Sequence, residues 1–161
     1  MKKRILTVAA LLAAFTAYSQ VPGHEATLRQ YSDGNVATIT QQGLEQGALV
    51  QQGIPAPDVR AGYGDFNEAT INQGLNSEDE SSERNSAQVI QTGNYNEAFV
   101  DQENDDNTAE VDQSGDNNTA DIDQFTPGAG EDGRADENSA SIDQSGDNNT
   151  ADIRQRGDDN E

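Results

Sequence analysis

The chain has 161 residues, a formal net charge of −21 and no cysteine, and only 32% of its residues are hydrophobic. Such acidity argues against binding to nucleic acid or to an anionic membrane surface, because both need clustered Lys and Arg to neutralise phosphate. The composition offers neither a large conventional core nor disulfides, and taken alone it is typical of a disordered chain.

The N-terminus predicts a secretory signal peptide over residues 1–19. Basic residues at positions 2–4 precede an apolar run over residues 5–15, and small residues follow at Ala17 and Ser19. The run is far shorter than the roughly 20 residues that span a bilayer, so no membrane insertion is expected. Cleavage after Ser19 leaves one domain, residues 20–161, with six arginines against thirty acids and a net charge of −24.

An eleven-residue repeat runs through residues 20–161, with the form Asn-x-Ala-x-(Ile/Val/Leu)-x-Gln-x-Gly-x-x. The third residue is Ala in all ten copies, the fifth is aliphatic and the seventh is Gln. This periodicity overrides the prediction of disorder. The copies begin at His24, Asn35, Gln46, Asn67, Asn85, Asn96, Asn107, Asn118, Asn138 and Asn149.

The marked residues of each repeat fall at offsets 0, 2, 4 and 6, the alternation of a β-strand with one distinct face. A turn such as Gly115-Asp116-Asn117 follows each strand. A strand that buries one Ala and one aliphatic side chain cannot offset a conformational entropy of about 1–2 kcal/mol per residue, so the strands must stack. We therefore predict an all-β fold, a β-solenoid of about five two-strand turns that stacks into a cross-β fibre.

The inward faces supply the candidate assembly residues. We expect the inward Asn and Gln amides of each layer to bond to those of the next, as in the polar ladders of cross-β assemblies. The ladder residues are Asn35, Gln41, Gln52, Asn67, Gln73, Asn85, Gln91, Asn96, Gln102, Asn107, Gln113, Asn118, Gln124, Asn138, Gln144, Asn149 and Gln155. The core residues are Ala37, Ile39, Ala98, Val100, Ala109, Val111, Ala120, Ile122, Ala140, Ile142, Ala151 and Ile153.

Three insertions, residues 54–66, 75–84 and 125–137, interrupt the repeat at corners. Their Gly, Pro, Ser and acidic residues favour solvated loops that leave the stack intact. Stacking every second strand also places Asp101 over Asp123 and Asp121 over Asp152, with like charges about 5 Å apart. We expect this repulsion to weaken at low pH or high salt.

Little in the chain could carry other chemistry. His24 is the single histidine and there is no cysteine, so an enzyme is not expected. Turns such as those at Gly115 and Gly146 offer oxygen ligands for Ca²⁺, but ordinary turn chemistry is the favoured interpretation. We expect no metal and no cofactor.

The segments Gln91–Gln102 and Gln113–Gln124 resemble the curlin repeat, Gln-x-Gly-x-x-Asn-x-Ala-x-x-x-Gln, and the resemblance extends with gaps from Asn35 to Asn160. It implies a secreted subunit of extracellular, curli-like amyloid fibres that support biofilm and cell adhesion. It also implies export through an outer-membrane secretion pore and growth with a nucleator subunit.

Two alternatives remain open at this point. Arg154 and Arg156 make the last repeat basic, which is similar to the nucleator type of subunit. A monomeric β-solenoid adhesin or binding module is the other alternative, and it would be favoured by a capping element. The repeat pattern indicates no cap at either end. We therefore expect the chain to polymerise with itself, head to tail.

Overall fold

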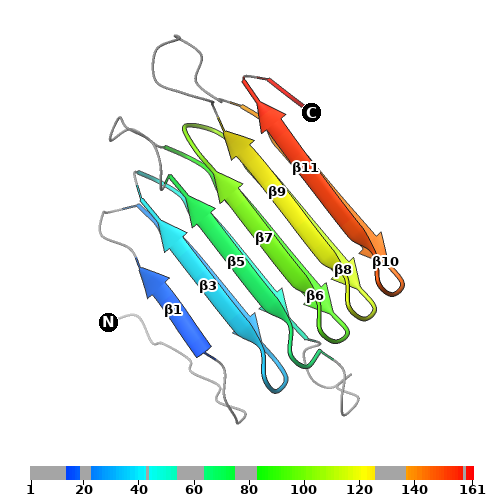
Figure 1. The fold of residues 1–161 in the computed structure, drawn as a ribbon. Helices are drawn as coiled ribbons and strands as arrows, with labels where there is room; N and C mark the ends of the chain where they lie inside the picture. Colours follow the sequence, from blue (N-terminus) through cyan, green and yellow to red (C-terminus); the bar gives the residue numbers. More distant parts are fainter. Residues whose placement is uncertain are drawn as a thin grey trace, which may run out of the picture.

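The computed structural model is a two-sheet stack of parallel strands (Figure 1). It describes residues 14–18, 23–42, 44–53, 64–74, 83–125, 137–157 and 159–161.

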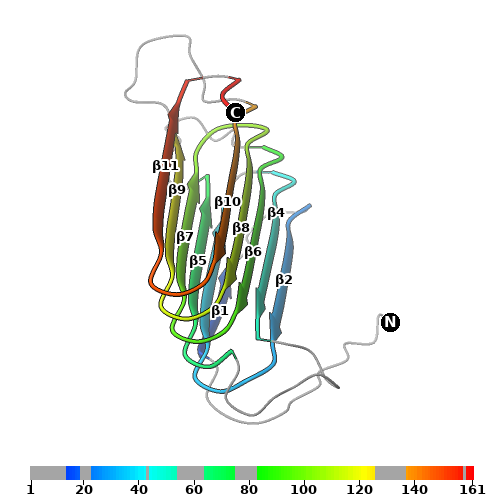
Figure 2. The same cartoon turned by 90° about the vertical axis from the view of Figure 1, so that its right-hand side faces the viewer.

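The six-stranded sheet contains, in spatial order, β1 (Ala14–Tyr18), β3 (Val36–Gln41), β5 (Glu68–Gln73), β7 (Glu97–Gln102), β9 (Thr119–Phe125) and β11 (Thr150–Arg156). The five-stranded sheet contains β10 (Ser139–Ser145), β8 (Thr108–Ser114), β6 (Ser86–Thr92), β4 (Gly47–Gln52) and β2 (Glu25–Gln30). From β2 onward successive strands alternate between the sheets (Figure 2). The chain therefore makes one turn for every two repeats, which confirms the predicted β-solenoid.

All strand pairs are parallel and keep one register. Where β11 lies on β9, for example, Ala151 pairs with Ala120 and Gln155 with Gln124. The same alignment of Ala with Ala and Gln with Gln recurs at every pair from β2 to β11. The expected pairs of Asp101 with Asp123 and of Asp121 with Asp152 are present.

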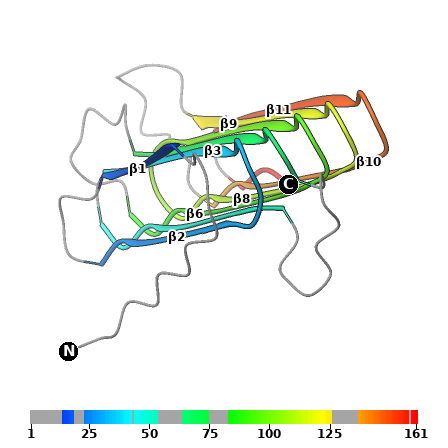
Figure 3. The ribbon, with the colours of Figure 1, turned by 90° about the horizontal axis from the view of Figure 1, so that it is seen from below.

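The core lies between the two sheets (Figure 3). Nearly every strand from β3 to β10 contributes one fully buried Ala and one fully buried Val or Ile, with outward residues alternating between them. Complete burial of a Val or Ile contributes about 1.5–3 kcal/mol, too little to order a single strand, so the stacked neighbours are what keep each layer folded.

The strands begin one residue later than the repeat frame suggests. Each Asn at the first repeat position lies just before its strand, and the residue before it adopts a positive φ, as at Tyr95 (57°) and Asn117 (59°). Phe66 and Tyr95 occupy equivalent corners in neighbouring layers. Their exposed rings stack with centroids 5.3 Å apart.

The strand β1 lies within the predicted signal peptide. It pairs in parallel with β3, from Ala14 opposite Val36 to Tyr18 opposite Thr40. The expectation that no element covers either end is therefore wrong for this edge of the full chain. The physical reason is that an open strand edge accepts any extended segment that reaches it.

The predicted insertions lie largely outside the described residues, as do residues 1–13. At the boundaries that are described, Phe125 belongs to β9 and not to the insertion 125–137. Among the described segments no helix is long and apolar enough to cross a membrane.

Candidate assembly interface

The inward glutamines form a continuous hydrogen-bonded ladder in each sheet. In every step, Nε2 donates to Oε1 of the glutamine in the next layer, at 2.7–3.0 Å. The six-stranded sheet carries Gln41, Gln73, Gln102, Gln124 and Gln155, and the five-stranded sheet carries Gln30, Gln52, Gln91, Gln113 and Gln144. All donors therefore point toward the C-terminal end of the solenoid.

The same glutamines also join the two sheets, which the repeat pattern does not reveal. Gln102 Nε2 in β7 donates to Ser86 O in β6 at 3.1 Å, and Gln113 Nε2 in β8 donates to Glu97 O in β7 at 3.0 Å. Each buried amide is thus shared between its own ladder and the opposite sheet. Removing one glutamine would leave partners unpaired in both directions, at about 1–3 kcal/mol for each group.

The asparagines form a ladder of a different kind from the one expected. Oδ1 of each Asn accepts the backbone N–H of the Asn in the next layer, as from Asn118 N to Asn96 Oδ1 at 3.0 Å. Nδ2 of Asn96 donates to Gly115 O at 2.8 Å. The expected bonds between Asn amides occur at Asn138, Asn149 and Asn160, which donate to the Asn below. The short side chain reaches the neighbouring backbone before it reaches another amide.

Gly93, Gly115 and Gly146 form the corner column that receives these Asn donors. A Cβ on Gly115 would lie 2.3 Å from Gly146 O, and a Cβ on Gly93 would lie 2.1 Å from Gly115 O. Both residues also have φ near +100°. Close stacking of corners therefore requires glycine at these two positions.

The outward faces concentrate carboxylates in one layer. Glu110 and Asp112 of β8 and Asp121 and Asp123 of β9 occupy all four outward positions at the middle of these strands. Partial burial, with repulsion from neighbouring carboxylates, raises the pKa of Asp112, Asp121 and Asp123.

Asp101 of β7 faces this layer from below. Burial, followed by repulsion from Glu103, Asp123 and Asp121, raises its pKa to about 6. Its Oδ1 is shielded from solvent and has no hydrogen-bond partner. At neutral pH the stack therefore holds an unfavourable negative charge at this position.

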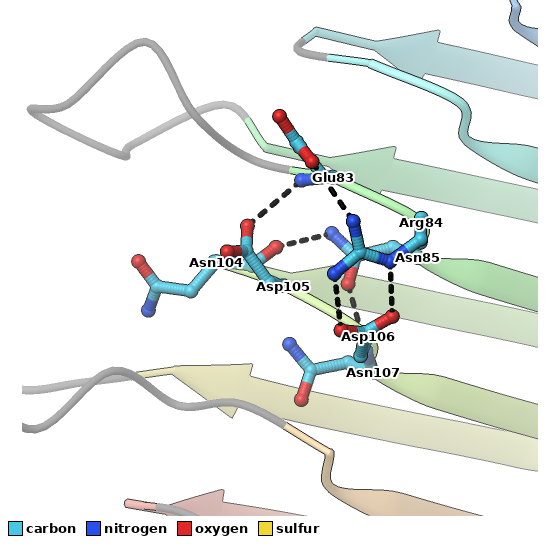
Figure 4. Close-up of polar contacts among 7 residues, drawn as sticks. All are labelled: Glu83, Arg84, Asn85, Asn104, Asp105, Asp106 and Asn107. Carbon is cyan, nitrogen blue, oxygen red and sulfur yellow. Dashed lines mark hydrogen bonds and ion pairs between the residues drawn. The ribbon is translucent and has the colours of Figure 1, made fainter.

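One corner carries an ion pair instead (Figure 4). Arg84 Nη2 lies 2.6 Å from Asp106 Oδ2, and Arg84 Nε donates to Asp106 Oδ1 at 2.7 Å. These hydrogen bonds lower the pKa of Asp106. Glu83 also contacts Arg84, at 2.9 Å. The repeat motif alone does not predict this pair, although each partner directly precedes a repeat Asn, at Asn85 and Asn107, next to strands that neighbour each other.

The structure places the predicted ladder residues at the inward positions and corners of one continuous stack, and most are less than 9% exposed. Asn149 and the core residues Ala151 and Ile153 are only partly buried, because they belong to the last layer. Among the described residues, no group of three or more His, Cys, Asp or Glu could hold a metal ion. The geometry is that of a stacking surface.

Two strands at opposite ends of the five-stranded sheet, β2 and β10, have one neighbour each, and β11 ends the six-stranded sheet. The model of the curlin associated repeat matches residues 83–115, 104–132 and 135–161. These three matches indicate the curlin family. No curated protein and no solved structure matches the chain.

The curlin repeats bear directly on function. Curlin repeats are structural and non-enzymatic, and proteins of the curlin family are extracellular fibre subunits that assemble with themselves. The repeats therefore suggest a subunit of the curli amyloid type. The ladders described above are the part of the molecule that such an assembly would extend.

Proposed function

We propose that the mature chain, residues 20–161, is secreted and polymerises head to tail into cell-surface fibres that strengthen a biofilm matrix and support adhesion. The observation that carries the proposal is the unbroken register of both sheets up to their end strands. Unpaired N–H and C=O groups along such an edge are a template for a further strand. Because the two ends differ, the contact does not close on itself and generates a filament.

The proposal includes removal of residues 1–19 during export. This step would take away β1 and leave the edge of β3 free. Both sheets would then present an open strand at each end. Export through an outer-membrane pore and growth from a nucleator subunit are part of the same proposal, by analogy with the family.

The test is polymerisation of purified residues 20–161. We expect sedimentable, unbranched fibres with a meridional reflection near 4.7–4.8 Å. Added fibre fragments should shorten the lag phase before the fibres grow. A small β-rich species that stays soluble for days at high concentration would contradict the proposal and favour a monomeric binding module.

A second candidate is the nucleator role, because β11 presents Arg154 and Arg156 and the Arg156 guanidinium lies 4.9 Å from the centroid of the Phe125 ring. A nucleator should accelerate growth of a partner curlin at low molar ratio. A main subunit should account for most of the fibre mass, so the composition of fibres from the native cell surface separates the two roles.

A further inference from the structure

We propose that successive molecules join through β10 of one copy and β2 of the next, and that Asp143 and Arg29 form an ion pair across this junction. The proposal rests on the proposed function, since it concerns a second copy of the same chain. It adds the residues that fix the direction and register of the contact.

The register follows from the strands already paired. Every pair in the five-stranded sheet aligns Ala with Ala and Gln with Gln. Continuing this alignment from β10 to the β2 of another copy places Ile142 opposite Leu28 and Gln144 opposite Gln30. Asp143 then lies opposite Arg29, about 5 Å away along the stacking direction.

The charges at these two positions lack an opposite charge in the part of the chain that the structure describes. Arg29 is exposed on β2 and its neighbour in β4 is the uncharged Gln51. Asp143 is exposed on β10 and its neighbour in β8 is another carboxylate, Asp112. Neither Arg29 nor Asp143 forms an ion pair among the described residues. The junction would give each one an opposite charge.

The parallel register also discriminates between orientations. A contact between two β2 edges, or between two β10 edges, requires one copy to be turned over, so the paired strands would run antiparallel. The alignment of Ala with Ala and Gln with Gln, which every internal pair keeps, would then be lost. Only the head-to-tail contact brings Arg29 and Asp143 together.

The glutamine ladder has matching free ends at the same junction. Gln144 Nε2 donates to Thr119 O at 3.0 Å and to no glutamine, whereas each earlier glutamine of this sheet donates to the one above it. At the other end Gln30 donates to Gln52, and its Oε1 accepts no hydrogen bond from the residues that the structure describes. A bond from Gln144 Nε2 to Gln30 Oε1 of the next copy would repeat the geometry of the internal steps.

Asn160 determines where the incoming strand begins. It already occupies the place above Asn138, with its N–H bonded to Asn138 Oδ1 at 3.0 Å and its carbonyl accepting the N–H of Ser139 at 2.8 Å. The first repeat of the next copy has His24 at the corresponding position instead of Asn. The junction layer would therefore combine Asn160 of one copy with residues 26–30 of the next.

The six-stranded sheet raises no conflict with this contact. Once β1 is removed, the same translation places β11 on β3, with Asp152 opposite Thr38 and Arg154 opposite Thr40. No like charges meet across this second pair of strands. Both sheets can thus continue together.

Charge reversal tests the pair in fibres of residues 20–161. Arg29→Asp and Asp143→Arg should each slow seeded elongation about three- to tenfold at low salt, because attraction becomes repulsion. The double variant keeps the wild-type net charge and should restore elongation. The two single variants change net charge in opposite directions, so a general charge effect would slow one and speed the other.

The outcomes separate the junction from the proposed function. If wild-type protein forms no fibres, the proposed function fails. If wild-type fibres grow and both single variants elongate at the wild-type rate, or their rates follow net charge alone, the junction is wrong. Slowing of both single variants with rescue by the double variant supports it.

Disulfide trapping gives a second measurement that does not depend on rates. The chain has no cysteine, and positions directly opposite on adjacent strands lie within disulfide range. Fibres of Arg29→Cys/Asp143→Cys should oxidise to covalent polymers. The control Thr27→Cys/Asp143→Cys shifts one partner by two residues and should not. Equal cross-linking of both, or of neither, would overturn the proposed register.

Discussion

Each inward glutamine of the inner layers has three partners at once: the layer above, the layer below and the opposite sheet. Gln113 accepts from Gln91 and donates both to Gln144 and to Glu97 O. The residue is fully buried. A side chain that only filled space could be replaced by a similar apolar one, but this amide is needed for its hydrogen bonds.

Gln113→Ala should therefore destabilise the stack by several kcal/mol, since it leaves buried donors and acceptors unpaired at about 1–3 kcal/mol each. Thr108→Ala is the matched control, because Thr108 is exposed on the same strand. The measurement is the denaturant midpoint for fibre dissociation and the elongation rate. Equal losses in the two variants would contradict the inward role of Gln113.

Substitutions in the glycine column distinguish the effect of close stacking from the effect of backbone conformation. Gly115→Ala should block ordered stacking, because the added Cβ would meet Gly146 O at 2.3 Å. Gly146→Ala has a similarly positive φ of 91°, but within one molecule the nearest atom to the added Cβ, Asn149 Nδ2, lies 3.8 Å away. In the soluble protein before polymerisation, we expect a much larger loss of β-sheet circular dichroism for Gly115→Ala than for Gly146→Ala, and comparable losses would show that φ alone is decisive.

At the scale of the strand, the inward and outward faces respond differently to pH. The inward amides do not titrate, whereas Asp101, Asp112, Asp121 and Asp123 have raised pKa values in the stacked state. A carboxyl whose pKa is raised on folding stabilises the folded state as pH falls from above the folded value to below the unfolded one. For Asp101 this window runs from about 6 down to 3.8.

The stack should therefore become more stable and elongate faster as pH falls from 7 to 4. Asp101→Asn should raise stability and elongation rate at pH 7 and flatten the dependence between pH 7 and 5. Glu97→Gln, which removes an exposed carboxylate from the same strand, is the control. An unchanged pH profile in Asp101→Asn would show that Asp101 does not dominate the response. The pair of Arg84 with Asp106 acts oppositely and weakens only in stronger acid.

The eleven-residue period was enough to predict the strands β2 to β11, their parallel pairing and the inward residues, because Ala, an aliphatic residue and Gln recur on one face. The bonding mode of the asparagines was not predictable from it. Whether Asn96 reaches another amide or Gly115 O depends on corner geometry, which the period does not specify. Two stacked aromatic rings at Phe66 and Tyr95 were missed for a related reason: they occupy corner positions outside the repeat motif.

At the scale of the whole molecule, a mature net charge of −24 opposes close approach of two copies. Screening reduces this repulsion, with a Debye length of about 10 Å at 0.1 M salt and about 3 Å at 1 M. We expect seeded elongation to quicken as sodium chloride rises over this range. The rate constant from seeded growth curves is the measurement, and growth that slows with salt would indicate that attractive pairs outweigh the net repulsion.

The uneven placement of carboxylates makes the outward charge of the assembled fibre vary periodically along its axis. The two outward positions at the middle of β3, β4 and β5 are uncharged, whereas those of β8 and β9 are all acidic. Five layers at about 4.8 Å place one such acidic belt every 24 Å or so along the fibre. A polycation lying along the fibre would meet alternating neutral and negative bands, so the fibre presents negative charge at a regular spacing along its length.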